Sequence, residues 1–594
     1  MRKEKVRSFV NGMLAVVLSA GLTFTTTACG TGSSGTSKMK TNDDGSIHKD
    51  LTALELTRLM GNGINLGNTM EAYGRTAFGT TGTVADYETY WGQPETTQEM
   101  ISGMKAAGFD TLRIPVAWTN MMDFESGDYT IREEYLDRVE EIMNYALNED
   151  MYVIINDHWD GSWWGMFGSA TEETREQAMD LYVSMWTQIA NRYKKYSDRV
   201  IFESANEELG NRLNDTDIAK DSGTLSPDDC YKEVLRINQA FVDTVRGTGG
   251  NNEQRFLLIA GYNTDIAMTV DERYQMPTDT AKSKLLISVH YYEPSGYCIN
   301  TSLDYWGTKG DYETMNENLA KMTKFTEQGY GVVIGEHGVL LQGQRELKEN
   351  ALAYYENFLD NCDIYNYAPV MWDTNETYNK QFKTITDKKL AQMYLDRSYA
   401  NEQNKSEEEL IAEAETRMEE ALANAKEPYR LPDDQAMAWI MFNSSDWGTL
   451  YSVGDVYNPE SKTGGIQATD VEITGEGTYT VALDFTGIAA GSANGVVFSA
   501  LAIGNGETLF PGYIIDIKEI KINGEVYTPV ANSYTSSDDQ LCTRVNLYNA
   551  WVSEAPDDAR TIDGSRDGIS PCILDADALG AIETIEITFD YVAP

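Results

Sequence analysis

Short apolar runs alternate with longer segments of helical period between residue 51 and about residue 400. The runs that predict strands are residues 63–66, 111–115, 152–156, 200–203, 255–260, 285–289, 332–335 and 369–372. The segments with helical period are residues 98–107, 131–147, 172–196, 231–246, 312–327 and 344–359. Eight strands joined by crossover helices predict an α/β fold, a closed (β/α)8 TIM barrel with its active site at the carboxyl ends of the strands. A doubly wound open sheet is the alternative, but no G-x-G-x-x-G motif follows a strand.

The composition and hydrophobic pattern of the sequence change after the barrel region, which we place at residues 51–402. Residues 403–430 include a stretch rich in Glu, Ala and Lys, which is typical of a solvated helix serving as a linker. Residues 431–594 contain alternating segments at 470–473, 479–485, 513–520 and 583–591, separated by Gly, Asn and Asp turns. This pattern predicts a second domain, an all-β sandwich.

Residues 1–29 have the pattern of an export signal. A basic start precedes an apolar stretch at 13–24, which is shorter than the roughly 20 apolar residues of a membrane-spanning helix. Thr26-Thr27-Ala28-Cys29 resembles the bacterial lipobox, whose cysteine is acylated, although Thr26 stands where leucine is usual. We therefore expect an exported bacterial protein, lipid-anchored at the outer cell surface through Cys29, with residues 30–50 as a flexible tether. Cleavage elsewhere, without a lipid, is the alternative.

Composition narrows the class of partner. The formal net charge of −46 would repel phosphate backbones and anionic lipid surfaces, so nucleic acid is not expected as a partner. The chain's 35 tyrosines and 11 tryptophans supply flat faces that suit neutral sugars, although such residues also fill cores. The cysteines after Cys29 lack C-x-x-C spacing, so no metal site is expected. Cys542 and Cys572 form either one disulfide or two buried thiols.

Polar and aromatic residues follow the predicted strands at the end where the active site of a barrel lies. They are Asn68, Arg113, His158, Asn206 and Glu207, His290 and Tyr292, Glu336 and Trp372, at the first, second, third, fourth, sixth, seventh and eighth strands. Any one of them alone has a structural explanation, as a helix cap, an ion-pair partner or a core residue. Together they place two carboxylates on one ring, which is what glycoside hydrolysis requires. Three of the chain's four histidines, His337 included, lie at these strand ends.

Five motifs resemble glycoside hydrolase family five, the cellulase family, over about residues 51–400. They are Gly-Ile-Asn-Leu-Gly-Asn at 63–68, Leu-Arg-Ile-Pro at 112–115, Ala-Asn-Glu at 205–207, His-Tyr-Tyr at 290–292 and Ile-Gly-Glu-His-Gly at 334–338. Tyr-Trp-Gly at 90–92 resembles the sequence found in the branch of the family that contains endoglucanases, lichenases and xyloglucanases. Two departures are Glu208, where the family often has proline, and His337, where it more often has Phe or Trp.

The resemblance implies roles for individual residues. Glu207 matches the acid/base and Glu336 the nucleophile of a double displacement. The residues that match the supporting and substrate-binding positions are Arg113, His158, Asn206, His290, Tyr292, Trp372, Asn68 and Trp91. Arg113 is expected to keep Glu336 ionised, because a neighbouring cation lowers the pKa of a carboxyl group.

The implied activity is that of a retaining endo-β-1,4-glucanase acting on cellulose-like, mixed-linkage or xyloglucan polysaccharides, as a monomer and without a cofactor. Mannanase-type specificity and a non-catalytic glycan-binding surface protein are the alternatives. Residues 431–594 resemble a carbohydrate-binding module, with four aromatic residues as candidate platforms: Trp439, Trp447, Tyr548 and Trp551. The opposing interpretation is that these aromatic rings form the core of the sandwich or pack against the barrel.

Overall fold

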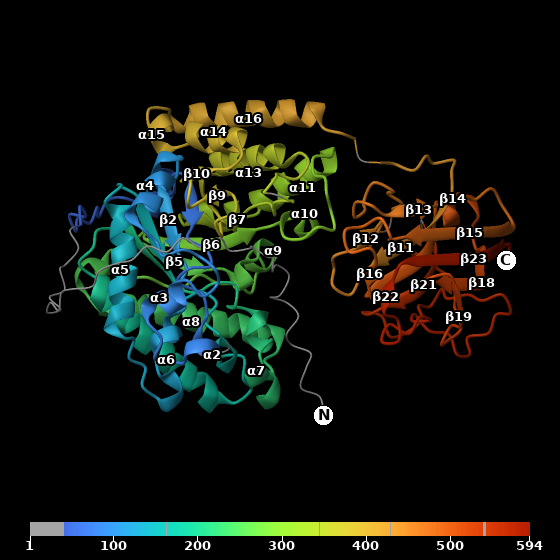
Figure 1. Cartoon of the computed structure of the whole chain (residues 1–594), viewed down its shortest axis with the longest axis horizontal. Helices are drawn as coiled ribbons and strands as arrows, with labels where there is room; N and C mark the ends of the chain where they lie inside the picture. The colour runs from blue at the N-terminus through green and yellow to red at the C-terminus, as the bar shows by residue number, and fades with distance from the viewer. Residues whose placement is uncertain (1–40, 162, 344, 428, 455, 539–541) are drawn as a thin grey trace, which may run out of the picture. The chain divides into compact units, whose positions relative to one another are not determined.

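The computed structural model describes residues 41–594, apart from residues 162, 344, 428, 455 and 539–541. Eight parallel strands form a closed barrel in the order of the chain (Figure 1). They are β1 (Gly63–Asn65), β2 (Thr111–Ile114), β3 (Tyr152–Ile155), β4 (Val200–Glu203), β5 (Leu257–Ala260), β6 (Leu285–Tyr291), β7 (Gly331–His337) and β8 (Tyr367–Met371). Each strand overlaps the run that predicted it, so the predicted TIM barrel is confirmed.

Successive residues of each barrel strand point to opposite sides of the wall. Arg113 on β2 is in register with Ile154 on β3, and Ile154 with Ile201 on β4. Both isoleucines belong to a buried cluster that includes residues of α1 (Ala53–Met60). Gly331, the first residue of β7, lies against Ala53. The inner row of side chains is therefore a packed core with α1 at its amino-terminal end, and Arg113 points into the barrel in the same row.

Helices connect the strands on the outside of the barrel. The longer ones are α4 (Gln98–Ala106), α5 (Glu133–Leu147), α6 (Glu172–Tyr193), α8 (Pro227–Gly247), α11 (Lys309–Ala320), α13 (Ala351–Tyr365) and α14 (Lys388–Asp396). Shorter ones are α2 (Arg75–Phe78), α3 (Val84–Glu88), α7 (Asp217–Ser222), α9 (Ile266–Thr269), α10 (Ser295–Cys298), α12 (Thr323–Thr326) and α15 (Tyr399–Glu402). A small hairpin of β9 (Tyr378–Asn379) and β10 (Thr384–Ile385) precedes α14.

Two predicted helices differ from the observed ones. The segment 312–327 is divided into α11 and α12, and α13 starts at Ala351 rather than at residue 344, which lies outside the described residues. Asn350, the residue before α13, has a φ of 64°, a left-handed conformation that interrupts a helix. The apolar periodicity of the sequence does not report such a break.

The helix α16 (Glu407–Asn424) occupies the segment predicted to be a solvated linker. Two of its residues, Leu410 and Ala414, are buried. Arg417 donates to the carboxylate of Asp360 on α13 at 2.6 Å, and Asp360 is itself buried. The helix therefore packs on α13, as Figure 1 also shows, and the expectation of a solvated spacer is wrong for this part of the segment. Only a narrow apolar stripe makes the contact, which is why the sequence pattern did not indicate it.

The carboxyl-terminal region is strand-rich, as predicted. One antiparallel sheet contains β12 (Leu450–Tyr451), β11 (Met437–Asn443), β17 (Phe498–Gly504), β21 (Cys542–Asn549) and β20 (Ser536–Asp538), with β14 (Val471–Glu472) also paired to β11. A second contains β13 (Gln467–Thr469), β15 (Gly477–Asp484), β23 (Thr584–Val592), β18 (Ile514–Ile522) and β19 (Glu525–Tyr527). A two-stranded sheet joins β16 (Ala493–Asn494) to β22 (Ala581–Ile582), and α17 (Gly506–Leu509) follows β17. Residues of both large sheets form one apolar core.

The four aromatic residues proposed as sugar platforms separate into two groups. Trp439 is completely buried in the sandwich core, and its indole nitrogen donates to the carbonyl of Ser452, so it is not a platform. Tyr548 is half-buried. Trp447 and Trp551 are 50% and 62% exposed, with ring centroids 5.8 Å apart. The alternating apolar pattern cannot distinguish these cases, because an aromatic residue suits either face of a sheet.

The structure decides whether Cys542 and Cys572 of the sandwich form a disulfide. Cys572 is a free thiol that donates to the carbonyl of Asn549, so the bridge to Cys542 is not formed. The signal segment and Cys29 lie outside the described residues. Among the residues that the structure describes, no helix has the length and apolar character to cross a membrane.

Candidate active site

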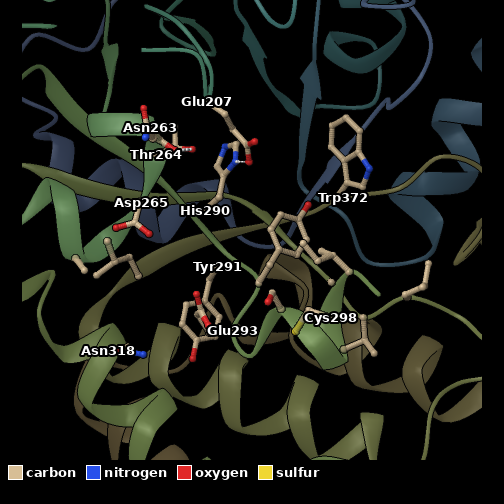
Figure 2. Close-up of a pocket in the computed structure, with 18 of the residues that line it drawn as sticks. Glu207, Asn263, Thr264, Asp265, His290, Tyr291, Glu293, Cys298, Asn318 and Trp372 are labelled. Atoms are coloured by element: carbon tan, nitrogen blue, oxygen red, sulfur yellow. Dashed lines mark hydrogen bonds and ion pairs between the residues drawn. The ribbon is translucent and has the colours of Figure 1, made fainter. Parts of the chain in front are cut away.

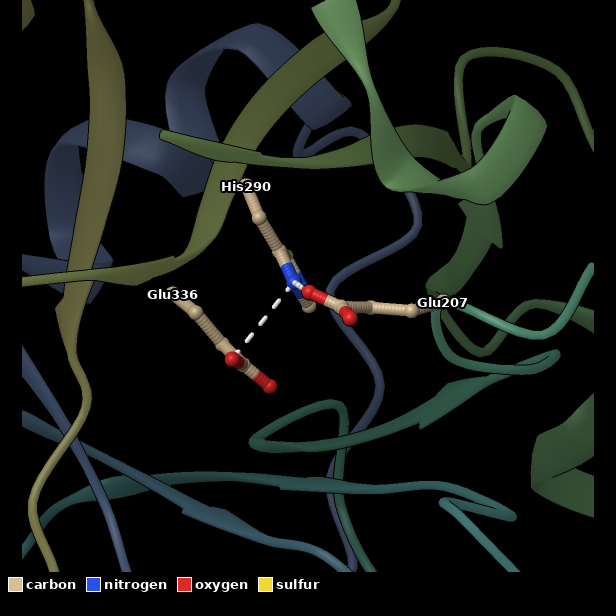
Figure 3. A group of neighbouring side chains, drawn as sticks. All are labelled: Glu207, His290 and Glu336. Carbon is tan, nitrogen blue, oxygen red and sulfur yellow. Dashed lines mark hydrogen bonds and ion pairs between the residues drawn. The ribbon is translucent and has the colours of Figure 1, made fainter. Parts of the chain in front are cut away.

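Two carboxylates face each other at the carboxyl ends of the barrel strands. Glu207 follows β4, Glu336 lies on β7, and His290 on β6 stands between them (Figure 3). One carboxylate oxygen of each glutamate and one ring nitrogen of His290 lie within 4.8 Å of one another. The Nδ1 atom of His290 is 2.9 Å from Oε1 of Glu207 and 3.5 Å from Oε2 of Glu336. A retaining glycosidase holds its carboxyl groups about 5–5.5 Å apart and an inverting one about 6.5–9.5 Å, so the short separation has the retaining geometry.

Each oxygen of the Glu336 carboxylate accepts one hydrogen bond. Nη1 of Arg113 donates to Oε1 at 3.0 Å, and the hydroxyl of Tyr292 donates to Oε2 at 3.1 Å. The strand pairing shifts register between Val289 and His290, where β6 pairs with β7. A bulge of this kind re-aims side chains beside an active site. Glu336 is therefore held in one orientation, with its side chain only 7% exposed.

Arg113 is fully buried and satisfies a network of acceptors. Its Nε donates to Glu203 at 2.7 Å, and its Nη1 also donates to Oδ1 of Asn65 at 2.9 Å. Its Nη2 donates to Oδ1 of Asn206 at 3.0 Å. Glu203 accepts a further hydrogen bond from Ser288. A buried guanidinium needs such partners, because an unpaired buried charge is strongly destabilising.

His158 and Trp372 form one wall of the site. Their rings are stacked, with centroids 5.7 Å apart and planes 7° from parallel. The amide nitrogen of Asn156 contacts Nδ1 of His158 at 3.2 Å, which assigns the ring proton to Nε2, 3.9 Å from Glu336. Burial lowers the pKa of His158 well below its ordinary value, with the charge of Arg113 adding to the effect, so the imidazole is neutral.

The two carboxyl groups differ in acidity. Burial raises the pKa of Glu336, and the charges of His290 and Arg113 offset only part of this effect. Burial acts in the same direction on Glu207, but the hydrogen bond and charge of His290 and the ion pair with Arg212 lower its pKa to about 2. Arg113 thus lowers the pKa of Glu336 as expected, but burial outweighs it. Of the two carboxyl groups, Glu207 is therefore the stronger acid.

A cavity of about 920 Å³ opens beside these residues. Glu207, His290, Tyr292 and Trp372 line it. In Figure 2, Glu207 and His290 lie between Trp372 and a polar loop that carries residues 263–265. Glycosidic clefts combine a few charged groups with flat apolar faces, and this lining has that composition.

Glu336 and five of the predicted supporting and substrate-binding residues are not among those lining this cavity: Asn68, Trp91, Arg113, His158 and Asn206. Asn68 follows β1 in a left-handed conformation, with a φ of 58°, and its backbone nitrogen donates to Glu71. Trp91 packs against Trp159, with ring centroids 6.1 Å apart, and Trp159 is 41% exposed. Trp159 follows His158 directly, so this pair continues the aromatic surface next to the predicted site.

Of the two departures from the family pattern, His337 is completely buried and Glu208 is half-buried. His337 stacks on Phe358 of α13 with centroids 4.2 Å apart, and neither ring nitrogen has a hydrogen-bond partner among the described residues. It follows Glu336 directly on β7 and packs outside the barrel wall, so only two of the three strand-end histidines reach the carboxylates. Burial raises the pKa of Glu208 to about 7, and the neighbouring charge of Glu207 acts in the same direction.

Three residues at the site were not predicted to act there. Glu203 and Asn65 end β4 and β1 and bind Arg113. A carboxylate inside an apolar strand was a signal for Glu203, because an isolated buried charge needs a partner. Arg212 contacts Glu207 from the loop beyond it, and no spacing rule identifies that contact in advance.

Comparison with known proteins identifies the class to which this barrel and its facing carboxylates belong. The profile "Cellulase (glycosyl hydrolase family 5)" matches residues 71–377. A xyloglucan-specific endo-beta-1,4-glucanase of Bacteroides ovatus is 34% identical over 348 residues, covering 55% of this chain and 66% of that protein. Endoglucanase A of Paenibacillus barcinonensis is 35% identical over 351 residues, covering 55% of this chain and 83% of that protein.

A solved structure agrees with these matches. A broad specificity endoglucanase from Ruminococcus champanellensis, with bound cellotriose, superposes with a TM-score of 0.52 at 31% identity, covering 58% of this chain and 99% of that one. The chain therefore belongs to glycosyl hydrolase family 5 and is a glycoside hydrolase of the cellulase type. The family match covers strands β2 to β8 of the barrel and does not extend into the sandwich.

Proposed function

We propose that the barrel is a retaining endo-β-1,4-glucanase in which Glu336 is the nucleophile and Glu207 the acid/base. The observation that carries this proposal is the pair of carboxylates within 4.8 Å across His290, one held by two donors and the other open to the cavity. The side chain of Glu207 is 29% exposed against 7% for Glu336. An acid/base must exchange protons with water in the second half of the reaction, which favours the more exposed group for that role.

In the first step Glu336 attacks the anomeric carbon, and Glu207 gives its proton to the leaving oxygen as the glycosidic bond breaks. In the second step Glu207 takes a proton from water, and the resulting hydroxide displaces Glu336. Tyr292 keeps its proton throughout, because burial and the charge of Glu336 raise its pKa well above the ordinary value. Asn206 offers its amide nitrogen to the sugar 2-hydroxyl, since its oxygen is engaged by Arg113.

The substrate proposed is a neutral β-1,4-glucan, as cellulose-like, mixed-linkage or xyloglucan chains. The relatives named above act on xyloglucan or are endoglucanases, and one neighbour holds cellotriose. Preference among these chains, and discrimination against mannan, rests on a few contacts in the cleft. Release of reducing ends from soluble cellulose derivative, mixed-linkage glucan, xyloglucan and mannan, assayed side by side with the full chain, tests the proposal. No release from any of them would leave only the non-catalytic glycan-binding alternative.

We also propose that the sandwich binds glucan through Trp447 and Trp551. Their exposed rings lie side by side at a tilt of 49°. Trp447 has a φ of 60°, a strained conformation for a large side chain, in a turn where Asp446 accepts from Gly448. Strain of this kind is retained where function needs it, and flat aromatic faces suit the apolar faces of sugar rings.

Binding to insoluble cellulose tests the role of these tryptophans. We expect W447A and W551A each to weaken binding about tenfold, equivalent to about 1.4 kcal/mol. V526A is the matched control, since Val526 is 64% exposed on the same domain. Unchanged binding in both tryptophan variants would contradict the proposal and leave a structural or partner-docking role for the pair.

For localisation, we propose an exported protein anchored through a lipid on Cys29. The support is the signal pattern at residues 1–29 and the lipobox-like run that ends it. In a bacterial host, C29S should release the protein into the medium or leave its signal uncleaved. Equal membrane retention of both forms, each with the signal removed, would refute the anchor.

A further inference from the structure

Each oxygen of the Glu207 carboxylate has a side-chain partner. Oε1 is 2.9 Å from Nδ1 of His290, and Oε2 accepts from Nη1 of Arg212 at 2.5 Å. Arg212 belongs to the short 3-10 helix η4 (Asn211–Asn214), beyond β4. Its side chain is 49% exposed and lines the same cavity. The arginine therefore covers one face of the proposed acid/base from the solvent side.

The positive charge of a guanidinium opposes protonation of the carboxylate that it contacts. Arginine has N–H donors and no acceptor, so it cannot accept a proton carried on Oε2, and its own N–H occupies one of the two lone pairs of that oxygen. A proton on Oε1 would point at His290, on the side of Glu336, rather than at a leaving group in the cavity. The oxygen from which the proton must be delivered is thus the one that Arg212 holds.

We infer that Arg212 is a positioning residue that keeps Glu207 ionised and ordered in the empty cleft and moves off it when the leaving-group side of a glucan chain enters. The inference rests on the proposed role of Glu207 as acid/base. Asp215 also lines the cavity and acts electrostatically on the guanidinium, so it offers another carboxylate to the displaced arginine.

Departure of Arg212 removes one of the two cations that lower the pKa of Glu207, and His290 remains as the other. The titratable and charged groups that act on Glu207 come from four segments: His158 after β3, Glu208 and Arg212 after β4, His290 and Tyr292 on and after β6, and Glu336 on β7. Without Arg212, the carboxylates of Glu208 and Glu336 repel a charge on Glu207, and entry of sugar removes water from it. Both effects raise the pKa of a carboxyl group. Substrate entry thereby raises the pKa of Glu207 toward the acid form that the first step needs.

The pH dependence of the kinetic constants distinguishes this role of Arg212 from that of a purely structural ion pair with Glu207. The basic limb of kcat/KM reports the acid in the free enzyme, whereas the basic limb of kcat reports it in the complex. In R212Q, we expect the basic limb of kcat/KM on a soluble glucan to move to higher pH by about one unit or more. The basic limb of kcat should stay in place, because Arg212 has already left Glu207 in the wild-type complex.

Two further variants serve as controls for the charge of Arg212 and for the loss of an exposed arginine elsewhere. R212K retains the cation and should keep the limb of kcat/KM near its wild-type position. R199Q is the matched control: Arg199 is 38% exposed and pairs with Asp150, but it lies before β4, at the other end of the barrel. Its profiles should be those of the wild type.

Either of two results overturns the inference. An unmoved kcat/KM limb in R212Q means that the pair does not control the ionisation of Glu207. Equal movement of both limbs means that Arg212 stays on Glu207 in the complex. Titration of the Glu207 carboxyl by carbon NMR, in the free wild type and in free R212Q, compares the ionisation of Glu207 in the two proteins without turnover. Failure of the proposed function itself is distinguishable, because the wild type would then release no reducing ends at any pH.

Discussion

The barrel and the sandwich carry two different kinds of candidate sugar-binding residues. At the strand ends of the barrel, Arg113, Glu203 and Glu336 are buried and joined by hydrogen bonds. On the sandwich, Trp447 and Trp551 are exposed, and their faces rather than any charge are offered to solvent. Charges act strongly only where water is excluded, whereas ring faces bind sugars without moving protons. Changes in the barrel should therefore alter rates, and changes in the sandwich should alter affinity for long chains.

The largest effect is expected at Glu336. E336Q keeps the shape of the side chain but removes the attacking charge, so turnover should fall on the order of 10⁴-fold or more. Steady-state rates on a soluble glucan and a thermal melt measure the two consequences. The melting temperature should stay close to that of the wild type. A variant with substantial turnover would remove Glu336 from the nucleophile's role.

Glu207 should show a loss that depends on the substrate. E207A should turn over natural glucans very slowly, because their leaving oxygen needs a proton, and azide should not rescue it. An activated aryl glycoside needs no such proton, so added azide should restore turnover and yield a β-glycosyl azide. Product analysis by NMR distinguishes the anomers. The α-azide would indicate inversion and overturn the retaining assignment.

Removal of the sandwich should have a smaller and selective effect. A chain ending after about residue 427 retains every proposed catalytic residue, so hydrolysis of short soluble oligosaccharides should be nearly unchanged. Activity on insoluble glucan should fall about tenfold, because a tethered second site raises the local substrate concentration. Rates on both substrates and the melting temperature decide the matter. Uniform loss with a destabilised barrel would assign the sandwich a structural role.

The smallest effect on turnover is expected at His337, where stability changes instead. Burial lowers the pKa of His337 to about 3, against about 6.5 in an unfolded chain. The unfolded state thus binds more protons between these values, and the wild type loses stability as pH falls through that window. H337F should raise the free energy of unfolding by about 1–2 kcal/mol at pH 7, because two unpaired polar atoms leave the core.

The gain from H337F should grow by about 1.4 kcal/mol for each pH unit below 6.5, down to about pH 3. Urea unfolding at pH 7 and pH 5 measures it. H48Q serves as the control for removal of a histidine outside the core, since the side chain of His48 is 67% exposed. A gain that is independent of pH would mean that His337 is not neutral in the folded protein.

The sequence determined the barrel, the strand-rich second region and the places of Glu207 and Glu336 along the chain. These features are local: a buried parallel strand is an apolar run, and a residue after it lies at the carboxyl end whatever surrounds it. The chain direction of parallel strands then brings such residues to one ring. That is why motifs separated by more than a hundred residues predicted one site.

Only the tertiary structure decided how those residues are paired. It turned His337 onto Phe358 rather than toward the carboxylates, buried Trp439 while exposing Trp447, and packed α16 on the barrel. It also brought Arg212 onto Glu207 and shared Arg113 between Glu203 and Glu336. Ion pairing and pKa depend on distance, burial and competing partners in three dimensions, and no spacing along the chain encodes them. The order in which the two carboxyl groups lose their protons is therefore a property of the fold.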